Sequence, residues 1–94
     1  MNLKDLRCEI DQIDEQITQL LEQRMNLVLD IAKTKKIQKI EVVDLSREQL
    51  VLDRIAQKVQ NPEYRSTIVN TYQDIMKNSR AYQQDFLKEN KKTD

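Results

Sequence analysis

The sequence predicts an all-α protein with one long N-terminal helix and two further helices. The 94 residues include no glycine and one proline, so few turns are available. Apolar residues recur at alternating steps of three and four, which is the period of one face of an α-helix. The length is that of one small domain, and we expect residues 1–94 to form a single unit.

The first predicted helix spans residues 3–36. Its apolar stripe consists of Leu3, Leu6, Ile10, Ile13, Ile17, Leu20, Leu27 and Ile31. Arg24 occupies the missing position of this stripe, and the same rhythm continued from Val28 reaches Lys35. A helix of ~34 residues is ~50 Å long, whereas a compact domain of this size has a radius of gyration of ~12 Å. The stripe therefore needs a partner along its length, and we expect an intertwined homodimer of three-helix protomers.

The remaining elements follow from local signals. Residues 36–43 lack a clear period and are predicted to connect the first two helices. Asp44 or Ser46 can cap the second helix, because either side chain can accept from free N–H groups of the first turn. That helix is predicted to end near Gln60. Asn61 and Pro62 then form a typical start for the third helix, and we expect the polar tail, residues 88–94, to be frayed.

Composition excludes several classes of function. Sixteen basic and sixteen acidic residues give a net charge of zero, which argues against a nucleic-acid or anionic-membrane partner. No apolar run approaches the ~20 residues of a membrane span. Cys8 is the single cysteine and there is no histidine, so we expect no intrachain disulfide and no metal site. The expected location is the cytoplasm.

Polar residues stand on or beside the predicted inward faces. They are Arg7, Arg24 and Lys35 in the first helix, Arg47 and Glu48 at the start of the second, and Ser79 and Gln83 in the third. Burying an unpaired cation costs several kcal/mol. Glu48 is the one carboxylate in this set, so the missing anions are expected to come from a ligand.

Each of these residues also has a simpler explanation. Arg24 could fix the register of a coiled coil, and Lys35 could complement the dipole at a helix C-terminus. The charged pair that starts the second helix could be solvated, and the two polar residues of the third helix could be packing compromises. All three helices, however, carry polar residues on their inward faces, at levels along the helices that allow these residues to meet. This combination favours a binding site.

Three blocks of sequence resemble the all-helical chorismate mutases. They are residues 6–14 (LRCEIDQID) with their continuation to residue 35, residues 43–49 (VDLSREQ) and residues 78–83 (NSRAYQ). The resemblance runs in order from residue 6 to residue 83. The architecture of that family, a three-helix protomer in an interlocked dimer, agrees with the expectation from helix length.

The resemblance implies an isomerase that converts chorismate to prephenate in phenylalanine and tyrosine biosynthesis, without a cofactor. The resemblance also assigns roles to individual residues. Arg24, with Arg7 of the other protomer, holds the two substrate carboxylates, and Lys35 and Gln83 donate hydrogen bonds to the ether oxygen. Glu48 accepts a hydrogen bond from the ring hydroxyl, assisted by the backbone near Asp44, while Arg47 and Ser79 complete the polar cage and Ile31 and Met76 form apolar walls. Two alternatives remain. An isochorismate-pyruvate lyase of the same fold would differ in its product, and a non-catalytic dimerisation or regulatory module would not bind chorismate.

Overall fold

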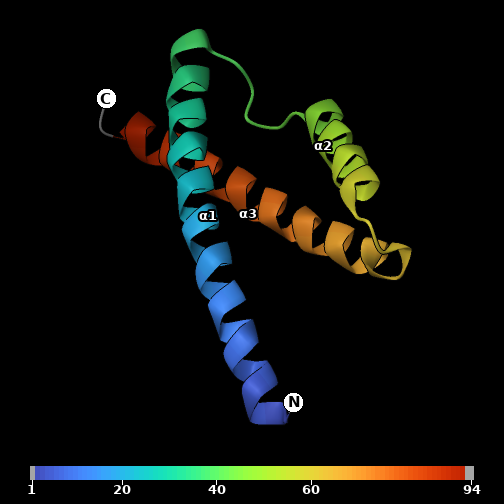
Figure 1. Cartoon of the computed structure of the whole chain (residues 1–94). Helices are drawn as coiled ribbons and strands as arrows, with labels where there is room; N and C mark the ends of the chain where they lie inside the picture. The colour runs from blue at the N-terminus through green and yellow to red at the C-terminus, as the bar shows by residue number, and fades with distance from the viewer. Residues whose placement is uncertain (1, 93–94) are drawn as a thin grey trace.

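A computed structural model describes residues 2–92 of the chain. Over this range the elements are the helices α1 (Leu3–Gln38), α2 (Leu45–Lys58) and α3 (Arg65–Lys92), with a 3-10 turn η1 (Pro62–Tyr64) before α3 (Figure 1). No strand occurs among these residues, which confirms the all-α class. Helix α3 includes residues 88–92 of the tail for which we expected fraying; residues 93 and 94 lie outside the described residues.

Helix α1 is two residues longer than the sequence predicts. It begins after Asn2, whose side chain accepts a 2.9 Å hydrogen bond from the backbone N–H three residues later. It ends at Gln38 because Lys39 adopts a left-handed conformation with φ of 56°. The next backbone N–H, that of Ile40, then bonds the Lys35 carbonyl at 2.9 Å, which satisfies one of the carbonyls at the helix end.

The caps predicted for the other elements are formed. The Asp44 side chain accepts from the backbone N–H of Arg47 at 3.0 Å and starts α2. Helix α2 ends at Lys58, two residues before the predicted end. Asn61 caps η1, with Pro62 as its first residue, and the chain continues directly into α3.

Helix α3 holds the chain together. It packs against both α1 and α2, whereas α1 and α2 do not pack against each other within the described range. The N-terminal half of α1 extends away from the other two helices (Figure 1). The apolar side chains that are buried among the described residues, Val28, Ala32 and Met76, belong to the C-terminal half of α1 and to α3.

The chain is elongated and leaves the α1 stripe exposed. Its extents are 57 × 26 × 14 Å and its radius of gyration is 16.8 Å, against ~12 Å for a compact domain. Its accessible surface is 7977 Å², whereas a compact monomer of this mass exposes ~5,700 Å². Every side chain of the stripe is between 46% and 64% exposed. Even so, no described helix is long and apolar enough to cross a membrane.

Candidate active site

A cavity of about 310 Å³ opens between α1 and α2, over α3. Its polar wall consists of Arg24, Lys35, Asp44, Arg47, Glu48, Ser79, Arg80 and Gln83, and its apolar wall of Val28, Ile31, Val42, Val51 and Met76. The structure thus brings together every site residue expected from the sequence except Arg7. The two residues expected as apolar walls, Ile31 and Met76, line it too.

A larger cavity, of about 600 Å³, lies beside the connection between α1 and α2. No fully buried residue lines it, and most of its lining side chains are exposed. The smaller cavity instead contains two buried polar side chains, Ser79 and Gln83. Convergent polar groups in a partly dry site are what small-ligand binding needs, so the smaller cavity is the candidate site.

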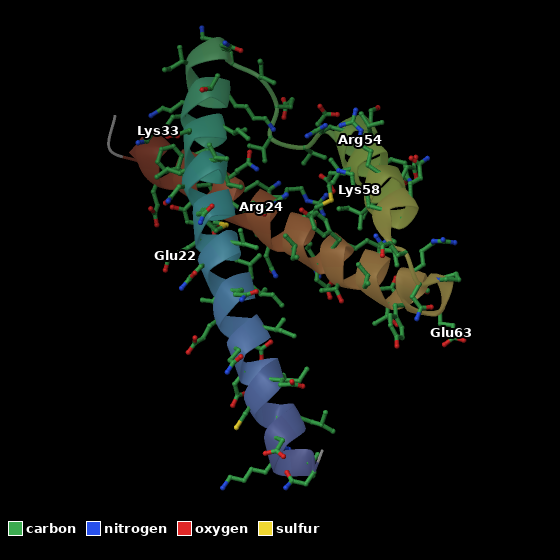
Figure 2. All side chains as sticks on the ribbon, viewed as in Figure 1. Glu22, Arg24, Lys33, Arg54, Lys58 and Glu63 are labelled. Atoms are coloured by element: carbon green, nitrogen blue, oxygen red, sulfur yellow. The ribbon has the colours of Figure 1, made fainter. Side chains whose placement is uncertain are left out.

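Arg24 is held in place from two sides. Figure 2 shows it where α1 crosses α3, and its Nη1 donates a hydrogen bond to Ser79 Oγ. The Ser79 hydroxyl in turn donates to the carbonyl of Ile75 at 2.8 Å. The Arg24 guanidinium carbon also lies 5.8 Å from the centre of the Tyr72 ring, a cation–π contact. Since a guanidinium carries five N–H donors, most of them remain for a ligand.

Lys35 and Gln83 enter the cavity from α1 and α3. Lys35 Nζ donates to the carbonyl of Val42 at 2.8 Å, which ties the end of α1 to the connection that follows it. Gln83 is 9% exposed, and its Oε1 is the buried side-chain polar atom without a partner among the described residues. Rotation of the amide exchanges its oxygen and its NH₂ group, so Gln83 can offer either one to a ligand.

Glu48 has a partner that the sequence reasoning did not assign. Arg80 Nη1 lies 2.9 Å from both Glu48 Oε1 and Glu48 Oε2, and this ion pair joins α2 to α3. The signal was present: Arg80 follows Met76 by four residues and precedes Gln83 by three, a spacing that places all three on one helix face.

Arg7 does not reach this cavity in its own protomer. It lies in the exposed N-terminal half of α1, seventeen residues before Arg24. That separation corresponds to ~26 Å along the helix axis. Arg7 is therefore not part of the cavity formed by its own chain.

The fold and the cavity define a class of protein, an all-helical chain with a cation-rich cavity between its helices. Comparison of the sequence with known proteins makes this class more specific. Residues 6–84 match the chorismate mutase type II family. The chain is 30% identical over 88 residues to the chorismate mutase of Methanocaldococcus jannaschii, covering 93% of this chain and 89% of that protein. It is 39% identical over 54 residues to the bifunctional chorismate mutase/prephenate dehydratase of Buchnera aphidicola, covering 57% of this chain and 14% of that protein.

The chain belongs to the chorismate mutase type II family. The family match covers all three blocks in which the sequence resembles the all-helical chorismate mutases. That resemblance is thereby confirmed, and with it the expectation that the protein is an isomerase.

Proposed function

We propose that the protein rearranges chorismate to prephenate in the cavity between its helices. The charge of the cavity wall carries this proposal. The wall has four cations, Arg24, Lys35, Arg47 and Arg80, and two carboxylates, Asp44 and Glu48, which leaves a net charge of +2. Chorismate is a dicarboxylate, so its charge is equal and opposite to that of the wall that one chain supplies.

The reaction suits a chain that has no histidine. One C–O bond breaks as a C–C bond forms within a single molecule, so neither a nucleophile nor a proton transfer is required. The protein has to select the chair-like conformer in which the reacting ends meet. It also has to offer positive charge where the ether oxygen becomes electron-rich in the transition state.

The arginines would select the conformer by holding the carboxylates. Arg24 is suited to this role because Ser79 and Tyr72 fix its guanidinium before a substrate arrives. The planar guanidinium matches a carboxylate with two parallel hydrogen bonds, which a lysine ammonium cannot do. Arg47, at the start of α2, would complete the cage on the opposite wall.

Lys35 and Gln83 would stabilise the breaking ether bond. The Lys35 ammonium has three donors and uses one on Val42. The buried amide of Gln83 has hydrogen-bonding capacity that the described residues do not use. A donor aimed at developing charge in such a site contributes ~3 kcal/mol. Glu48 would accept a hydrogen bond from the ring hydroxyl, assisted by the backbone near Asp44.

The proposal includes a second copy of the chain. Two protomers would pair along their α1 stripes as an intertwined homodimer, which would cover the apolar side chains that one protomer exposes. Arg7 would then enter the partner's cavity. The cytoplasm as location and the supply of prephenate for phenylalanine and tyrosine synthesis are further parts of the proposal.

Following chorismate consumption and identifying the product tests the function. We expect prephenate from chorismate, and no pyruvate from isochorismate supplied in a parallel reaction. Lys35→Met should reduce kcat by a factor of about 100 or more. The matched control is Lys33→Met on the exposed side of α1, which should retain the activity of the parent. Release of pyruvate from isochorismate would favour the lyase, and failure to bind chorismate would favour a non-catalytic module.

A further inference from the structure

The Glu48–Arg80 ion pair forms one wall of the cavity. The two oxygens of the carboxylate are equidistant from Arg80 Nη1, at 2.9 Å each. The side chains of Arg80 and Glu48 are 29% and 23% exposed, so water has only partial access to the pair. Both residues line the cavity, and the pair is therefore within reach of whatever binds there.

Two consecutive residues of α3 organise opposite walls of the cavity. Ser79 accepts from Arg24 on α1, and Arg80 donates to Glu48 on α2. No hydrogen bond or ion pair joins Arg24 to Glu48 within the described part of the chain. Loss of the Arg80 side chain should therefore disturb the Glu48 wall and leave the Arg24 wall in place.

A carboxylate in the wall of a dianion site needs compensation. Glu48 would repel the carboxylates of the substrate and turn outward toward water unless a cation held it. Arg80 is the cation that the structure places on the Glu48 oxygens over the described residues. Because its Nη1 lies between the two oxygens, each oxygen keeps lone-pair capacity for another donor.

We propose that Arg80 is a positioning residue that holds the Glu48 carboxylate where it can accept the hydrogen bond of the substrate's ring hydroxyl. This inference rests on the proposed function. Arg80 then determines how strongly the enzyme prefers a substrate that carries this hydroxyl. It acts through Glu48 and does not bind a substrate carboxylate itself.

The test compares chorismate with its analogue in which hydrogen replaces the ring hydroxyl. For the parent we expect kcat/KM to favour chorismate by about tenfold or more, the usual range for a hydrogen bond to a charged group. In Arg80→Gln and in Glu48→Gln this preference should fall to less than about threefold. The kcat/KM for chorismate should decrease, whereas the kcat/KM for the analogue should stay near that of the parent. Arg80→Lys should restore part of the preference, because it returns the positive charge.

The matched control is Arg54→Gln, which removes an exposed cation of α2 outside the cavity (Figure 2). It should leave kcat/KM for both substrates within twofold. An Arg80→Gln variant that loses activity equally on both substrates would overturn the inference, since that result indicates a general structural role or direct binding of a carboxylate. An unchanged preference in Arg80→Gln would overturn it as well. A parent protein without mutase activity would instead refute the proposed function.

Discussion

At the scale of single residues, the polar side chains of the cavity differ in whether the protein satisfies them. Arg24 and Glu48 have protein partners, Ser79 and Arg80, whereas the buried Gln83 oxygen has none among the described residues. A buried polar atom without a partner costs ~1–3 kcal/mol. For the role that the proposed mechanism gives Gln83, the amide has to turn so that its NH₂ group, and not this oxygen, faces the ether oxygen.

Gln83→Glu tests that assignment. The replacement keeps the shape of the side chain but donates a hydrogen bond only when the carboxyl is protonated. At pH 7 the carboxylate would face the developing negative charge of the ether oxygen, so we expect kcat to fall by a factor of about 100. Acidification protonates the carboxyl and should recover part of the loss, while the parent changes little over the same pH range.

The control for this variant is Gln84→Glu, the same change one residue later at an exposed position. It should keep the rate and the pH profile of the parent. If Gln83→Glu did so too, Gln83 would have no role at the ether oxygen.

At the scale of secondary-structure elements, the sequence predicted most of what the structure contains. Periodicity identifies the three helices, and the Asp44 and Asn61 caps are those that side-chain chemistry favours. The C-terminal end of α1 was predicted less accurately than the caps. A glycine usually marks such an end, and here Lys39 takes that role. Spacing along α3 places Arg80 on the inward face, but its pairing with Glu48 was not predicted, because that partner depends on how α2 and α3 pack.

The left-handed Lys39 gives a test of the α1 boundary. A residue with a Cβ atom pays ~1–2 kcal/mol in this conformation, and glycine avoids the cost. We expect Lys39→Gly to raise the free energy of unfolding by about 0.5–1 kcal/mol, measured by urea denaturation. Gln38→Gly, one residue earlier within the helix, should lower it by about 1 kcal/mol. Equal destabilisation by both changes would contradict a left-handed end at Lys39.

At the scale of the whole molecule, the exposed surface indicates what one protomer lacks. The α1 stripe faces solvent over most of the 57 Å length of the protomer, and the packed part involves the C-terminal half of α1. Among the described residues nothing covers this stripe, because α2 and α3 do not extend along it (Figure 1). Pairing with a second α1 would cover the stripe, and it would also place Arg7 near a cavity.

Ile13→Lys tests whether the stripe is an interface. We expect the parent to sediment as a dimer and its unfolding midpoint to fall on dilution, because dissociation and unfolding are then linked. A lysine at Ile13 would place a charge in the interface, and the variant should dissociate or unfold. Thr18→Lys adds the same charge on the other side of α1 and should remain dimeric. A folded, fully active monomer at micromolar concentration would contradict the dimer.

Mixing Arg7→Ala with Arg24→Ala tests whether Arg7 serves the opposite protomer. Each homodimer lacks one arginine in both of its sites and should be nearly inactive. In a heterodimer, one site carries both lesions and the other carries neither, if Arg7 crosses the interface. Random exchange makes about half of the dimers heterodimers, so about a quarter of the sites, and of the parent activity, should return. If Arg7 acted within its own chain, every heterodimer site would keep one lesion. Confirmed heterodimers without recovered activity would therefore exclude the cross-protomer role.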